Sequence, residues 1–143
     1  NFTENEVIIH CMEFNEQIQA LQRLLAEVGN GSQRFPFYKG ETEYYLPLSD
    51  ILFFETEEGR ISVHTSENVY QTTYKLYELE DLLPGCFLRI SKSSILNVSR
   101  IYSITRSLST CVVQFQNSHK QVYVSRHYYK PLKLKLEERW VSV

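Results

Sequence analysis

Several features are scarce or missing in this sequence, and each absence excludes a class of protein. Among 143 residues there are only 3 cysteines, Cys11, Cys86 and Cys111, an odd number without a CxxC pair. They predict reduced, partly buried thiols rather than a disulfide framework. No apolar run approaches the roughly eighteen residues of a membrane span, and the first residues lack the basic and apolar regions of a signal peptide. We therefore expect a cytoplasmic protein that does not enter a membrane.

Signatures of catalysis and of cofactor binding are also missing. The sequence contains no P-loop, no GxGxxG and no G-x-S-x-G elbow. Its 4 histidines are scattered without metal-ligand spacing. Glu55, Glu57 and Glu58 fit a solvated acidic turn better than acid–base chemistry. The sequence therefore predicts neither an enzyme nor a bound metal or organic cofactor.

Acidic residues are absent from one long block, although the formal net charge of the whole chain is only −2. Residues 37–86 carry ten acidic and three basic residues, a net charge of −7, whereas residues 87–136 carry nine basic residues and no Asp or Glu, a net charge of +9. Such segregation is typical of a surface that binds a polyanion. The alternative is that the acidic and basic halves pair with each other in the fold.

Aromatic and alternating apolar residues are abundant. The chain has 10 Tyr and 8 Phe, and short apolar runs of period two follow one another from residue 35 onward, which favours a mainly β fold. We expect about nine or ten strands, with a hairpin turn at residues 57–60 and short helices over 75–83 and after residue 126. The leucines of the helix over 75–83, Leu82 among them, are predicted to face the core.

A separate strand and amphipathic helix are expected before this β region. Residues 7–11 form a β-branched apolar run, and an apolar seam at helical spacing follows before the glycine-rich residues 29–32. The seam consists of Phe14, Ile18, Leu21, Leu25 and Val28. We therefore divide the chain into residues 1–34, a candidate dimerisation element, and residues 35–143, a β domain. The seam could equally pack against its own domain.

The stretch FLRISKSSILN, residues 87–97, is the strongest candidate for a binding site. Between its apolar ends, two cations and three hydroxyls gather without an acid: Arg89, Ser91, Lys92, Ser93 and Ser94. A strand that runs into such a turn can hold phosphate oxygens and contact a base edge. The alternative is an ordinary polar turn. Aromatics interleaved with the basic residues could stack on single strands, as in OB-fold proteins, although their alternation favours a β core.

In their order and spacing, these segments resemble the LytTR DNA-binding domain family of bacterial transcription regulators over Tyr44–Leu136. The family pattern is an apolar strand ending in an acid, a hairpin, a tyrosine–threonine strand, a leucine-rich helix, an FxRxHxSxxVN block and a final SR before a short helix. The matching segments here are ILFFE at 51–55, VYQTT at 69–73, the leucines of 76–83, FLRISKSSILN at 87–97 and SR at 125–126. Two positions depart from the pattern, because Ser91 replaces the family's His and Leu96 its usual Val.

The resemblance implies an elongated arrangement of small β-sheets whose loops enter successive major grooves of double-stranded DNA and bend it. By position, Lys92 and Arg126 fall where family members contact bases, and the hairpin at Gly59 and Arg60 falls at a third contact. The expected phosphate contacts are Arg89, Ser91, Ser93, Ser125, Tyr129, Lys130 and Lys133. The RISKS form resembles small regulators without a receiver domain, so no phosphoacceptor aspartate is expected.

We therefore predict a bacterial transcription regulator that binds paired half-sites of double-stranded DNA, as a homodimer. An Arg or Lys that donates to guanine O6 and N7 discriminates by about 1–3 kcal/mol, whereas phosphate contacts set affinity and its salt dependence. Two alternatives belong to other classes. One is a protein-interaction module that uses the helix at 14–28, and the other is an OB-like binder of single-stranded nucleic acid.

Overall fold

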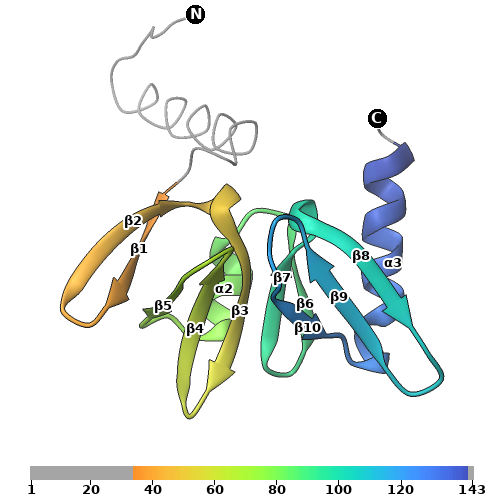
Figure 1. Ribbon diagram of the computed structural model, residues 1–143, viewed down its shortest axis with the longest axis horizontal. Coiled ribbons are helices and arrows are strands. Elements are labelled where there is room, and N and C mark those ends of the chain that lie inside the picture. The colour runs from red at the N-terminus through yellow and green to blue at the C-terminus, as the bar shows by residue number, and fades with distance from the viewer. Residues whose placement is uncertain (1–33, 142–143) are drawn as a thin grey trace, which may run out of the picture.

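The computed structural model describes residues 34–141, with side chains described as far as residue 138; the predicted strand, helix and apolar seam of residues 7–28 lie outside this range. The described chain is mainly β (Figure 1). Its strands are β1 (Arg34–Lys39), β2 (Thr42–Pro47), β3 (Ile51–Glu57), β4 (Arg60–Thr65), β5 (Val69–Thr72), β6 (Phe87–Ser91), β7 (Ser94–Asn97), β8 (Ile101–Arg106), β9 (Cys111–Phe115) and β10 (Gln121–Tyr123). Its helices are α2 (Leu76–Leu82) and α3 (Arg126–Val141), with single 3-10 turns η2 (Leu48–Asp50) and η3 (Val98–Arg100).

The strands form two antiparallel sheets. The larger sheet has 7 strands in the order β2-β1-β5-β4-β3-β7-β6, and the smaller has 3 strands in the order β10-β9-β8. Neighbours in the chain mostly pair as hairpins, but β3 also pairs with β7, which brings the FLRISKSSILN stretch beside the ILFFE strand. The mainly β class and the predicted number of strands are confirmed.

The β3–β4 hairpin has the tight turn that the sequence predicted. Glu58 and Gly59 both have positive φ, at 50° and 79°, as the two central residues of a two-residue type I′ hairpin turn require. Glycine adopts this conformation without the steric penalty that a Cβ brings. The turn therefore fixes the register of β3 against β4, with Glu57 opposite Arg60.

Two apolar cores lie on opposite faces of the larger sheet. Successive residues of a strand point to opposite faces, so Phe53 packs with β9, β10 and α3, whereas Phe54 packs with β1, β4 and α2. Leu96 and Ile95 of β7 divide in the same way. This two-sided burial explains why β3 begins with four consecutive apolar residues, 51–54, instead of alternating apolar and polar ones.

The helices differ from expectation in two respects. Leu76 and Leu79 are buried, but Leu82 is 47% exposed, so the prediction that it faces the core is wrong. At 100° per residue, Leu82 lies about 120° around the helix from Leu76, whereas Leu83 returns to the buried side and packs against the core. The closing helix α3 has 16 residues and is longer than predicted, with the fully buried Leu132 as its anchor.

Asn97 is a buried polar residue that joins β7 to β3. Its side-chain amide donates to the carbonyl of Ile51 at 2.9 Å, and its side-chain oxygen accepts from the backbone N–H of Ser99 at 3.0 Å and from the Ser99 hydroxyl at 2.6 Å. A buried amide without partners would cost about 1–3 kcal/mol. The last residue of the FLRISKSSILN stretch is therefore structural, and it holds the two strands that carry the turns of the site.

Candidate nucleic-acid interface

Three of the sequence-predicted segments lie along one edge of the molecule. The β3–β4 turn, the β6–β7 turn and the first residues of α3 all lie along the lower edge in Figure 1. Two backbone hydrogen bonds hold them together, from Thr56 N–H to the Ser93 carbonyl at 2.8 Å and from Ser125 N–H to the Ile90 carbonyl at 2.9 Å. The fold thus brings the predicted base-contacting residues of three separate segments to a single surface.

The β6–β7 turn presents Lys92 and Ser93 to solvent. The Ser91 hydroxyl accepts from the backbone N–H of Ser93 at 3.1 Å and lies 3.4 Å from the Ser93 hydroxyl, so a side chain closes the turn from inside. No hydrogen bond or ion pair engages the Lys92 ammonium among the described side chains. The turn therefore offers one unpaired cation on a fixed backbone.

Arg89 supports this turn from below. Its Nε donates to the Ser91 carbonyl at 2.8 Å, one terminal nitrogen donates to the Lys92 carbonyl at 2.5 Å, and the other lies 2.6 Å from the Glu80 carboxylate. The guanidinium has a planar fork that suits such a three-point contact. The predicted contact between Arg89 and a phosphate stays a prediction. In this structure the Arg89 guanidinium donates to protein acceptors instead.

Helix α3 begins with the predicted SR pair. The Ser125 carbonyl accepts from the backbone N–H of Tyr128 at 2.9 Å, at the start of the helix. Arg126 is exposed, and its guanidinium makes only a long 3.5 Å contact to the Leu108 carbonyl. Lys130 and Lys133 follow at i+4 and i+7, so all three cations share one exposed helical face. The opposite face packs through Leu132 against the core.

Tyr129, another predicted phosphate contact, lies under a cation. The Arg106 guanidinium carbon is 3.9 Å from the centre of the Tyr129 ring, a cation–π geometry that joins β8 to α3. The interleaved aromatics divide into two groups. Phe87, Phe115, Tyr128 and Tyr129 pack against the cores, whereas Tyr102 and Tyr123 are exposed. The expectation that these rings fill the β core therefore holds for the first group only.

Ion pairs between the acidic and basic halves are few in the described part of the chain. One joins the halves, between Arg89 and Glu80, and the other described pair links Lys135 to Glu138 at 3.7 Å. Lys92 and three cations of α3, namely Arg126, Lys130 and Lys133, thus have no ion-pair partner among the described residues. Most cations of residues 87–136 therefore form no ion pair with the acidic half, which favours binding of a polyanion over pairing of the two halves.

A carboxylate–histidine cluster that spacing alone did not reveal lies on the sheet beside this edge. Single ligand atoms of Glu55, Glu57 and His64 lie within 4.8 Å of one another, because the three residues share one face of β3 and β4. Burial raises the pKa of Glu55, the neighbouring Glu57 raises it further, and the Ser94 hydroxyl opposes them. Glu55 is half-buried, so the predicted solvated acidic turn comprises Glu57 and Glu58 only.

His64 is held neutral in this cluster. Its ring stacks on Phe53 with centroids 4.3 Å apart. Burial, followed by the nearby Lys120 ammonium, lowers the pKa of His64 to about 4. Lys120 Nζ lies 3.3 Å from His64 Nδ1. An ammonium only donates, so Nδ1 accepts and Nε2 carries the proton. Nε2 is buried and has no hydrogen-bond partner among the described residues. With Nδ1 facing an ammonium and Nε2 protonated, the ring offers no free lone pair to a metal, and a metal requires one.

The fold and this edge define a class of protein. An antiparallel β domain with a row of unpaired cations and hydroxyls on its turns is suited to contacting a nucleic-acid backbone and base edges. Within residues 34–141, α2 and α3 are separated by five strands, so no helix–turn–helix is formed there. The same residues contain no helix long and apolar enough to cross a membrane.

Comparison with known proteins identifies the family. The model of the LytTr DNA-binding domain matches residues 41–137, and the chain belongs to this family. A solved structure of the LytTr DNA-binding domain from a Bacillus cereus protein, described as a methyl-accepting/DNA response regulator, is 28% identical. It superimposes with a TM-score of 0.66 over 74% of this chain and 97% of that one.

Full-length relatives are also similar. An uncharacterized HTH-type transcriptional regulator of Staphylococcus aureus strain NCTC 8325 / PS 47 is 27% identical over 136 residues, which cover 95% of this chain and 92% of the relative. A second such regulator, from the bovine strain RF122 / ET3-1, is 26% identical over the same shares of both chains. The similarity thus extends beyond the family domain into the N-terminal residues.

Proposed function

We propose that this protein is a transcription regulator that binds double-stranded DNA in a sequence-specific manner through the turns of its basic edge. The row of unpaired cations along that edge carries the proposal, and the family and the names of the relatives support it. Lys92 and Arg126 donate to base edges in the major groove, since both are exposed and lie at the ends of rigidly held segments. The β3–β4 hairpin at Gly59 and Arg60 supplies the third base contact.

The phosphate contacts come from the side chains around these base contacts. Ser93 and Ser125 offer hydroxyls beside Lys92 and Arg126, whereas Lys130 and Lys133 continue the cationic face of α3. Ser91 supports the turn from inside, as its hydrogen bond to Ser93 indicates. Phosphate contacts set register and affinity, whereas base contacts discriminate among sequences. The two groups are therefore separable by mutation.

The test compares Arg126→Ala with Lys133→Ala by fluorescence anisotropy on duplex from the protein's own upstream region, with random duplex in parallel. Arg126→Ala should lose about 1–3 kcal/mol on the specific duplex and much less on the random one. Lys133→Ala should weaken both duplexes alike and lower the log–log salt slope by about one unit. Lys39→Ala is the control, because Lys39 donates to Asn68 away from the edge. Equal losses for both variants on both duplexes would refute the assigned roles.

We further propose that the protein acts as a homodimer on paired half-sites, with residues 1–34 as the dimerisation element and the apolar seam from Phe14 to Val28 as the contact. The double substitution Leu21→Glu, Leu25→Glu should halve the sedimentation mass at micromolar concentration and leave the β domain folded. An unchanged mass would remove the seam as the dimer contact. If the seam instead binds another protein, the parent would already sediment as a monomer while still binding specific DNA.

A further inference from the structure

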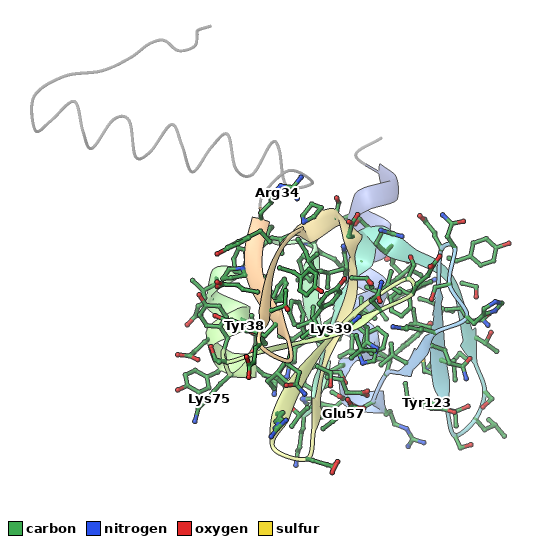
Figure 2. All side chains as sticks on the ribbon, turned by 60° about the vertical axis from the view of Figure 1, so that its left-hand side comes forward. Arg34, Tyr38, Lys39, Glu57, Lys75 and Tyr123 are labelled. Carbon is green, nitrogen blue, oxygen red and sulfur yellow. The ribbon has the colours of Figure 1, made fainter. Side chains whose placement is uncertain are left out.

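A hollow of about 680 Å³ opens next to the predicted base-contacting turns. It lies between the β3–β4 hairpin, β5, the start of α2 and β6, and its walls include Arg60 and Lys92. Tyr38 of β1 and Lys75, the residue before α2, also line it, and Figure 2 shows both on the same flank of the molecule. The hollow therefore continues the basic edge away from α3, beyond the β3–β4 hairpin.

The hollow is lined by positive charge, although most of its lining residues belong to the acidic part of the chain. Residues 37–86 carry a net charge of −7 and only three cations, yet two of these, Arg60 and Lys75, line the hollow. Arg89 and Lys92 add two more from the basic block, and none of the lining residues is Asp or Glu. Two of the three cations of residues 37–86 thus lie at the same hollow as two cations of the basic block.

Of the four cations of the hollow, Arg89 is committed to protein partners, whereas Arg60, Lys75 and Lys92 have none among the described residues. Among the described side chains, no hydrogen bond or ion pair engages the Lys75 ammonium. Its nearest sequence acid, Glu78, accepts from the backbone N–H of Lys75 at 2.8 Å and is committed to capping the first turn of α2. Hydroxyl donors, including Thr73, line the same walls. Unpaired ammonium groups beside hydroxyls are the donors that phosphate oxygens attract.

We propose that this hollow binds phosphates of the DNA backbone that flank the base-contacted half-site. The inference rests on the proposed function, and it extends the contact surface to Lys75 and Thr73, which are not among the contacts expected from the sequence. Double-stranded DNA carries one negative charge for about every 1.7 Å of its axis. A duplex that contacts Lys92 and Arg60 therefore presents further phosphates as it continues past the β3–β4 hairpin. Lys75 contributes affinity and salt dependence there but no sequence discrimination.

The test measures the affinity of Lys75→Gln and of the parent for two specific duplexes over a range of salt concentrations. One duplex has about ten flanking base pairs on each side, and the other is trimmed to the half-sites alone. On the long duplex the log–log salt slope should fall by about 0.9, the value for one lost phosphate contact. On the trimmed duplex the variant and the parent should bind alike. Lys39→Gln is the matched control, because Lys39 is the third cation of the acidic block and donates to Asn68 at 2.9 Å outside the hollow.

Each outcome separates this inference from the function on which it rests. If the parent prefers the specific duplex but Lys75→Gln and Lys39→Gln have equal slopes on the long duplex, the flanking contact is refuted and the regulator remains. If the parent shows no preference for the specific duplex, the proposed function itself fails. A third arm titrates inorganic phosphate without DNA and follows the amide signals of Thr73 and Lys75 by NMR. Saturable binding there, lost in Lys75→Gln while the DNA slope is unchanged, would assign the hollow to a free phosphorylated ligand instead.

Discussion

Replacing Arg89 by methionine tests whether this residue supports the β6–β7 turn or contacts DNA. Methionine keeps much of the apolar stem but removes the guanidinium, whose three nitrogens donate to the Ser91 and Lys92 carbonyls and to Glu80. Both side chains of the ion pair are partly exposed, at 22% and 43%, so that pair alone contributes only about 0–1 kcal/mol. The two carbonyl bonds from a charged donor add to this, although water replaces them in part.

We therefore expect Arg89→Met to lower the free energy of unfolding by about 1–2 kcal/mol. For the β domain of residues 35–143, that loss corresponds to a fall in Tm of about 4–9 °C, measurable by circular dichroism. Affinity for specific duplex should fall because the Lys92 turn is less rigidly held. The log–log salt slope should stay at the parent value, since no phosphate contact is lost.

Glu80→Gln provides the matched control, because it breaks the same ion pair while leaving every cation in place. If Arg89 positions the turn, this variant should lose part of the stability and bind DNA no better than the parent. If Arg89 contacts a phosphate, freeing its guanidinium from Glu80 should raise affinity, and Arg89→Met should lower the salt slope by about 0.9. Those two results together would refute the positioning role and support the contact expected from the family pattern.

Three further predictions concern stability. The pKa of His64 is lowered to about 4 in the folded protein, so the unfolded chain takes up the His64 proton at higher pH than the folded one, and the free energy of unfolding should fall as the pH drops from about 6.5 toward 4. His64→Phe should flatten this pH dependence, as measured by urea titrations at each pH. An unchanged pH dependence in the variant would contradict the assignment. Glu55, whose pKa is raised, acts in the opposite sense in both proteins, so the comparison isolates His64. Leu132→Ala should cost about 2–5 kcal/mol in chemical denaturation, because the side chain is fully buried between α3 and the sheets; a loss below about 1 kcal/mol would show that α3 is not anchored there. Gly59→Ala should cost about 1–2 kcal/mol through its φ of 79° alone, since a Cβ would meet no atom within 4 Å; a neutral result would mean that the turn changes its conformation.

The local elements of this protein follow from short-range patterns in its sequence. Alternating apolar residues and short apolar runs predicted the strands, and the glycine at position 59 predicted the β3–β4 turn, because these signals depend only on neighbouring residues and on backbone sterics. The charge blocks likewise predicted a basic surface, and the absence of an acid in residues 87–136 leaves little with which its cations could pair locally. The order of the motifs was sufficient to identify the family.

The partners of individual side chains were decided by tertiary structure. The strand order β2-β1-β5-β4-β3-β7-β6 is not sequential, so it places β7 beside the ILFFE strand, and β6 next to β7, in a register that no local pattern encodes. The fold packs α2 beside β6, so that Glu80 meets Arg89, and it pairs β7 with β3, so that Ser94 lies beside Glu55. It also brings Lys75 and Lys92, which lie in blocks of opposite charge, to the walls of one hollow. The sequence determines which chemical groups the protein has, but the distances between remote side chains are set only when the sheets pack.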